Sequence, residues 1–204
     1  TVCKNYAPAT LKTLDGTIAG ASLKQAGQVG KAYVFDGTND EVTIARNTIP
    51  AWSGKSTLGL ICKVLTAVAS DKPIIDCQWG ANGSGGWQIL VNDGLLTQAF
   101  VADATERDGV TFTAKSMTDA FHFIVVTKNT TAGTQKIYVD GVLLGTNSAL
   151  TNGTTQPDTD KDLIFGANHP KDNFINVNLS HVFFNSVDLT DAQILRLAQI
   201  AGLA

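Results

Sequence analysis

The sequence predicts an all-β fold, a sandwich of antiparallel strands that ends in one short helix. The first observation is the stretch 135–145, in which Asp140-Gly141 separates two short apolar runs. This dipeptide is a strong hairpin signal, because a type I′ turn needs positive φ at both central positions. The second observation is that short β-branched and aromatic runs recur at roughly 8–12-residue spacing, which is typical of sandwiches.

The first half of the chain reads as short strands joined by polar turns. Residues 5–30 are predicted to be loop-rich, because glycines punctuate them. Strands are predicted at 31–35, 41–44, 57–64, 74–79, 87–91 and 95–101. Polar and apolar residues alternate in 41–44, as expected of a half-buried strand. Residues 102–119 are polar and contain the charge-dense run of the chain, so they read as a solvated loop.

The second half continues with strands and then changes its period. Strands are predicted at 121–127, 163–166 and 174–185, and the first of them precedes the hairpin. Three consecutive antiparallel strands are therefore expected around Asp140. Thr190 and Gln193 then fit a capping box. An apolar stripe follows, consisting of Ile194, Leu195, Leu197 and Ile200, and Gly202 stands where a helix would end.

The length of 204 residues suits one all-β domain over residues 1–204, in which residues 1–12 could form an N-terminal arm. Hydrophobic residues make up 44% and charged residues 16%, with a formal net charge of −3. This charge offers no basic surface, so nucleic acid is not an expected partner. No stretch reaches the about 20 apolar residues of a membrane span, and no secretory signal is recognisable at the N-terminus. Oligomerisation stays open.

Three cysteines are too few for a disulfide scaffold. Cys62 and Cys77 are predicted on neighbouring strands, where they could face each other across a hairpin. The alternative is that both are small buried thiols. Cys3 is left without a partner in either case.

Several motifs resemble the laminin G-like, concanavalin A-like family of jelly-roll sandwiches. They are the segment 30–37 followed by Asp40 and Val42, the strand 121–127, the hairpin 137–141, the strand 163–166 and the segment 189–194. The match covers about residues 13–202. The resemblance implies a jelly roll of two antiparallel sheets, but it says little about function because this fold hosts lectins, hydrolases, lyases and adhesion modules.

The sequence is interpreted as non-catalytic. The family's glycoside hydrolases use two carboxylates, usually glutamates close together on one strand. This chain has two glutamates, Glu41 and Glu106, in distant segments. The three histidines, His122, His169 and His181, show no metal-ligand spacing.

Carbohydrate binding needs an aromatic ring for stacking and planar polar groups that fix hydroxyls. Trp79 and Trp87 bracket a Gly/Asn/Ser loop, with Gln78, Asn82 and Gln88 beside them. These five residues are the predicted carbohydrate site. The alternative is that both tryptophans pack in the core or against the loop, since tryptophan is usually highly buried.

A calcium ion is a second ligand that the resemblance implies, because many family members hold one at the edge of the sandwich. Asp36, Asn39 and Asp40 are the candidate oxygen ligands. The alternative is turn chemistry, since Asp-Gly and Asn-Asp favour tight turns and bind their own backbone. Asp140 is assigned to its turn alone.

Two functions from different classes remain. The first is a lectin-like module for glycan binding and adhesion, displayed on a virion or cell surface, with its ligand at the loops of one end or on the concave sheet. The second is a structural virion protein, such as a capsid decoration or tail component, whose partner is the protein shell of a larger assembly. A glycoside hydrolase ranks third.

Overall fold

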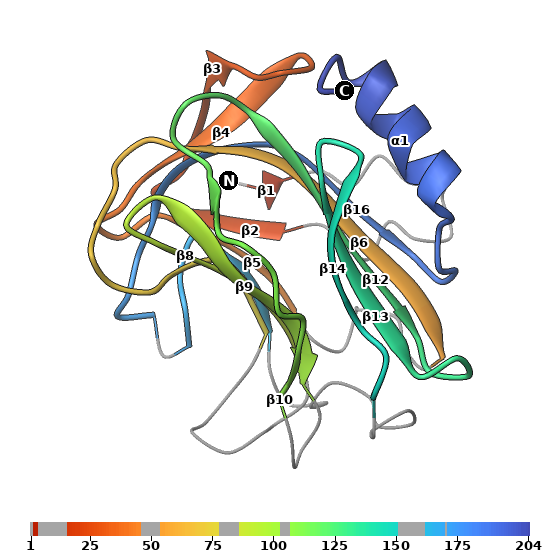
Figure 1. Cartoon of the computed structure of the whole chain (residues 1–204). Helices are drawn as coiled ribbons and strands as arrows, with labels where there is room; N and C mark the ends of the chain where they lie inside the picture. Colours follow the sequence, from red (N-terminus) through yellow and green to blue (C-terminus); the bar gives the residue numbers. More distant parts are fainter. Residues whose placement is uncertain are drawn as a thin grey trace.

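The computed structural model describes residues 2–3, 16–45, 54–77, 86–102, 107–150, 162–169 and 171–204. Across these residues, two antiparallel sheets face each other and one helix lies on the outer side of the second sheet (Figure 1). The predicted all-β sandwich with a short C-terminal helix is confirmed.

Sheet A has nine strands in the described part of the chain, in the order β1-β2-β5-β15-β7-β8-β9-β10, with β11 also paired to β9. Their bounds are β1 (Val2–Cys3), β2 (Gly16–Ala19), β5 (Glu41–Ile44), β7 (Lys72–Asp76), β8 (Gly86–Asn92), β9 (Leu95–Ala102), β10 (Arg107–Gly109), β11 (Lys115–Ser116) and β15 (Leu163–Phe165). The strands predicted at 74–79, 87–91 and 95–101 correspond to β7, β8 and β9, which are consecutive antiparallel neighbours.

Sheet B has seven strands among the described residues, in the order β14-β13-β12-β6-β16-β4-β3. Their bounds are β3 (Ser22–Ala26), β4 (Lys31–Asp36), β6 (Lys55–Val64), β12 (His122–Asn129), β13 (Thr134–Val139), β14 (Val142–Asn147) and β16 (Asn176–Asn185). The β13–β14 turn has φ of 53° at Asp140 and 79° at Gly141, so the predicted hairpin is confirmed.

The strand period of two sorts side chains between the two faces of sheet B. On β12, Ile124 and Val126 point into the core between the sheets, whereas Phe123 and Val125 point to the outer face. The outer side chains pack against α1 (Asp191–Ile200), which buries Ile194 and Ala198. The molecule therefore has a large core between its sheets and a smaller one under the helix.

The N-terminus of α1 has the predicted capping box. The Thr190 hydroxyl accepts from the Gln193 N–H at 3.3 Å, and the Gln193 side chain accepts from the Thr190 N–H at 2.9 Å. The predicted apolar stripe is only partly right, because Leu195 and Ile200 are exposed. Within the described residues, no helix is long and apolar enough to span a membrane.

Two segments that read as loops contain short strands instead. The predicted opening loop contains β2 and β3, and the polar segment 102–119 contains β10 and β11. The strand β2 is held by a partner distant in sequence, through the pairing of Thr17 with Thr43, whereas β10 pairs with the preceding strand β9. Their own residues are too few and too polar to show the period of a strand.

The cross-hairpin arrangement that the sequence left open for Cys62 and Cys77 does not occur. Cys62 lies on β6 in sheet B, whereas Cys77 follows β7 in sheet A. Both are free, buried thiols, which confirms the alternative. Consecutive strands switch sheets at this point, so closeness along the chain does not make them neighbours.

Candidate ligand-binding site

The structure describes two of the five residues of the predicted carbohydrate site, Trp87 and Gln88. Gln78, Trp79 and Asn82 lie outside the described residues. Trp87 belongs to the core between the sheets and is 1% exposed. Its ring therefore fills the core in this structure and is not placed where a sugar could stack on it, as the core alternative expected. The role of Gln78, Trp79 and Asn82 in carbohydrate binding stays a prediction.

Gln88 points to the outer face of sheet A, because its neighbours Trp87 and Ile89 both point into the core. Its amide nitrogen lies 3.4 Å from the carboxylate of Asp76, the residue paired with it on β7. Asp76 is only 2% exposed, and its other oxygen accepts the backbone N–H of His169 at 3.1 Å. Gln88 and Asp76 thus help to seat the loop after β15 on sheet A.

A second pair on this face has the same role. The Lys171 ammonium lies 2.6 Å from the Glu41 carboxylate and 3.3 Å from the Thr43 hydroxyl. Lys171 adopts a φ of 76°, a strained value for a side-chain-bearing residue. These contacts hold the loop after β15 against β5, and they direct the polar groups toward one another and not toward open space.

The three candidate calcium ligands lie in the β4–β5 turn, but two already serve the backbone. The Asp36 carboxylate accepts the Thr38 N–H at 2.7 Å, and the Asp40 carboxylate accepts the Asp36 N–H at 2.9 Å. Asp40 is buried against Gly20, where a Cβ would meet its carboxylate, while Asn39 is exposed. The turn alternative accounts for this geometry. Among the described residues, no three His, Cys, Asp or Glu side chains gather as a metal site would require.

We expect removal of calcium with EGTA to leave the melting temperature of the protein unchanged. A calcium site uses about 6–8 oxygen ligands, whereas the β4–β5 turn offers few carboxylate oxygens that the backbone does not already use. Thermal unfolding with EGTA and with added CaCl₂ checks this, with MgCl₂ as the ionic control. A calcium-specific rise in melting temperature, lost in Asp36→Asn, would show that the turn holds the ion.

The described residues do form a pocket at the end of the sandwich that contains this turn, and we call it the end pocket. Its volume is about 150 Å³, equal to about five water molecules. Its walls come from the β4–β5, β6–β7 and β8–β9 connections and from the start of β16. The lining residues are Asp36, Gly37, Thr66, Val68, Lys72, Val91, Gly94, Phe174, Ile175 and Asn176.

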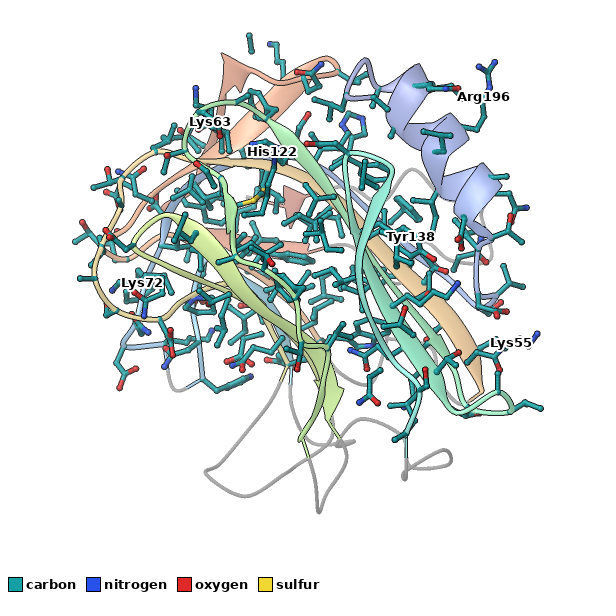
Figure 2. All side chains as sticks on the ribbon, viewed as in Figure 1. Lys55, Lys63, Lys72, His122, Tyr138 and Arg196 are labelled. Carbon is teal, nitrogen blue, oxygen red and sulfur yellow. The ribbon has the colours of Figure 1, made fainter. Side chains whose placement is uncertain are left out.

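The polar groups of the end pocket are held in place by their neighbours. The Lys72 ammonium donates to the Asn173 side-chain oxygen at 2.6 Å, and the Asn176 amide donates to the Thr66 hydroxyl at 3.1 Å. Figure 2 shows Lys72 at the end of the sandwich where β7 begins. Gly37 has a φ of 82°, and a Cβ there would lie 3.1 Å from the Asn176 nitrogen. A glycine is therefore needed where the turn meets β16.

The end pocket combines groups that suit a small polyhydroxylated ligand. Asp36 offers a carboxylate acceptor, Lys72 an ammonium donor and Asn176 a planar amide. The half-buried ring of Phe174, with Val68 and Val91, forms the apolar part. Such a mixture can fix hydroxyl groups while an apolar sugar face packs against the wall.

A larger groove of about 560 Å³ runs beside α1 on the outer side of sheet B. Its lining residues are Phe183, Asn185, Leu189, Ala192, Gln193, Arg196 and Leu197. It is mostly apolar and wide open, and Arg196 supplies its charge. The groove is less suited to a sugar than the end pocket, because it places few polar groups around any one position.

Sequence reasoning found one residue of the end pocket, Asp36, by its position in a turn. It missed Lys72, Phe174 and Asn176, which come from segments distant in sequence and show no motif of their own. A partial signal was present in the loop 167–173, which connects two predicted strands and contains two asparagines, one lysine and one aspartate.

A comparison with protein families identifies this architecture. The family model described as Concanavalin A-like lectin/glucanases superfamily matches residues 33–195. The chain belongs to this superfamily. The matched range includes the end pocket, the strands β5 to β16 and the first half of α1. No curated protein sequence matches the chain.

Several solved structures have the same fold as this chain, at low sequence identity. The crystal structure described as the receptor binding domain of botulinum neurotoxin D is 14% identical, with a TM-score of 0.71, and the alignment covers 91% of this chain and 49% of that one. The binding domain of botulinum neurotoxin DC in complex with SialylT is 16% identical, with a TM-score of 0.69, covering 92% and 47%. The same domain in complex with rat synaptotagmin II is 16% identical, with a TM-score of 0.67, covering 92% and 48%.

The chain therefore spans about half the length of these binding domains. At such identities the likeness shows the fold alone. What each of those domains binds is a property of that protein.

Proposed function

We propose that the protein is a non-catalytic, lectin-like binding module that holds a terminal residue of a glycan in the end pocket. The observation that carries this proposal is the convergence of Asp36, Lys72 and Asn176 around an apolar wall that includes Phe174. The pocket volume of about 150 Å³ admits one small group and not a chain of sugars.

The composition of the end pocket fits binding better than hydrolysis. Glycoside hydrolysis uses two carboxylates that flank the scissile bond. Among the described lining residues, Asp36 is the one carboxylate. Glu41 is engaged by Lys171 on the outer face of sheet A, and Glu106 lies outside the described residues. Neighbours with the same fold that are described as binding domains are in keeping with this proposal.

Adhesion on a virion or cell surface is the setting that we propose for this activity, on the grounds of the sequence alone. The alternative, a structural virion protein, predicts that the partner is a protein shell. A glycan array separates the two, because a shell component has no reason to select among sugars.

We expect the wild-type protein to bind a subset of an array of terminal monosaccharides and short glycans, and Lys72→Met to weaken that binding at least tenfold. Loss of one charged hydrogen bond to a ligand costs about 1.5–3 kcal/mol, and 1.4 kcal/mol is tenfold. Lys31→Met is the matched control, because Lys31 is exposed at the opposite end of β4 from Asp36.

Equal binding by Lys72→Met and Lys31→Met would exclude the end pocket as the site. Trp79→Ala in the same array tests the predicted carbohydrate loop. An array without any selective binding by the wild type would contradict the lectin-like function itself.

A further inference from the structure

Both nitrogens of the His122 ring lie against carboxylates. Nδ1 is 2.7 Å from Asp140 Oδ2, and Nε2 is 3.0 Å from Asp119 Oδ1. Carboxylates only accept hydrogen bonds, so each ring nitrogen must donate for both contacts to be favourable. A neutral ring carries one N–H and would turn a lone pair toward one carboxylate. The geometry therefore fits the doubly protonated imidazolium.

Two further titratable groups, Cys62 and Lys63, lie beside these three side chains in the described part of the chain. Its side chain is 6% exposed at the start of β12 (Figure 2). The residue opposite on β6 is Cys62, whose thiol pKa is raised by burial and further by Asp140, so the thiol stays neutral. The Lys63 ammonium donates to the Asp119 backbone carbonyl at 3.3 Å, and the Ser116 hydroxyl donates to its carboxylate at 3.3 Å.

The three side chains join separate parts of the fold. Asp140 forms the β13–β14 turn, and its second carboxylate oxygen accepts the Phe123 N–H at 2.9 Å. Asp119 lies in the segment 117–121, which connects β11 of sheet A to β12 of sheet B. In that segment Met117 donates its N–H to Gly94 and accepts the Val64 N–H, so its backbone bridges the two sheets.

We propose that Asp119, His122 and Asp140 form a proton-operated clasp, which is closed while His122 is doubly protonated and loosens when the ring loses a proton. In the closed state the imidazolium ties the segment 117–121 and the β13–β14 turn to the first residue of β12. Deprotonation leaves one carboxylate without its hydrogen bond. Asp119, at 63% side-chain exposure, is the partner that can turn to solvent.

The direction of the pH dependence follows from the two titrations. The hydrogen bond that His122 donates to Asp140 is the main cause that raises the pKa of His122 above its usual value of about 6.5, against the opposing effect of burial. The clasp therefore stabilises the fold fully below about pH 6.5 and loses that contribution as the pH rises through the higher folded pKa. The hydrogen bond from His122 lowers the pKa of Asp119 to about 2. Acid therefore weakens the clasp as the pH falls from about 4 toward 2.

The clasp borders the end pocket. Gly94 lines that pocket, and a Cβ on it would lie 2.6 Å from a methyl carbon of Thr118 in the segment 117–121. Loosening this segment removes a support of the pocket wall, so ligand affinity should fall as the pH rises. This step rests on the proposed function, whereas the measurements below need no ligand.

The direct test is the titration of His122 followed by NMR of its ring protons. We expect a pKa above 6.5 in the wild type and a lower one in Asp119→Asn, whose exposed side chain can change without disturbing the core. The rate of amide exchange across 117–121, corrected for its intrinsic pH dependence, should increase at pH values above the wild-type pKa of His122. A His122 pKa at or below 6.5 would overturn the proposal.

The linked test is stability against pH by chemical denaturation. Each unit by which the folded pKa exceeds the unfolded one should change the unfolding constant by up to tenfold between low and high pH. His122→Gln should lose this step and His181→Gln should keep it, since His181 is exposed on β16 and hydrogen-bonds to Ser180. If His122→Gln does not fold, Asp119→Asn replaces it in this test, and we expect its unfolding constant to change less with pH than that of the wild type. A wild-type step retained in these clasp variants would contradict the clasp.

Discussion

Trp87→Ala is expected to lower the free energy of unfolding by about 3–5 kcal/mol, the range for truncating a fully buried large aromatic residue. The indole is 1% exposed and belongs to the core cluster that includes Leu58 of sheet B and Ile89 of sheet A. Its removal would leave a cavity with apolar walls, which water does not fill favourably. Urea or guanidinium denaturation at fixed pH measures the change. The loss is large against the about 5–15 kcal/mol that stabilises a typical domain.

Gln88→Ala is the matched control for this experiment. Gln88 is the next residue on β8, but it points to the opposite face, and its contact with Asp76 is long at 3.4 Å. Its loss should cost less than about 1.5 kcal/mol. If Trp87→Ala changed the free energy of unfolding only slightly but abolished glycan binding, the prediction that this tryptophan stacks on a sugar would be correct after all.

Local signals were enough to predict the central strands of this fold. The β13–β14 turn follows from Asp140-Gly141, and the core strands follow from their β-branched and aromatic runs. The short strands β2 and β10 could not be predicted in this way, because a short polar segment becomes a strand only through the partner beside it. The resemblance to the jelly-roll family supplied the topology that these local signals lack.

The sites were harder to predict than the fold, because their residues meet only in three dimensions. Asp36 is visible as a turn residue, but nothing in the sequence brings Lys72 and Phe174 beside it. The same holds for His122, whose carboxylate partners are 3 and 18 residues away. Asp140 was assigned to its turn alone, and it does form that turn. Its carboxylate has a second role that positive φ and the Asp-Gly signal do not reveal.

Ile194→Ala is expected to cost about 2–5 kcal/mol, the range for truncating a buried aliphatic residue. Ile194 is fully buried among Ile61, Phe123 and Tyr138 on the outer face of sheet B, and it is the main apolar anchor of α1. Alanine favours a helix slightly more than isoleucine does, by less than about 0.7 kcal/mol, so lost packing dominates over propensity. Chemical denaturation gives the cost, and amide exchange within α1 shows whether the helix detaches first.

Leu195→Ala separates packing from every other effect of a shortened side chain in this helix. Leu195 is adjacent in sequence but 41% exposed, so its truncation should cost less than about 1 kcal/mol. The polar contacts of α1 are too weak to replace the packing of Ile194. The Tyr138 hydroxyl and the Lys136 ammonium both bond to Asp191, which is itself exposed and so contributes little. Equal losses for the two variants would mean that α1 is held at its ends and not through Ile194. A larger loss for Ile194→Ala, with early exchange of the α1 amides, would establish that the helix is held by the small core beneath it.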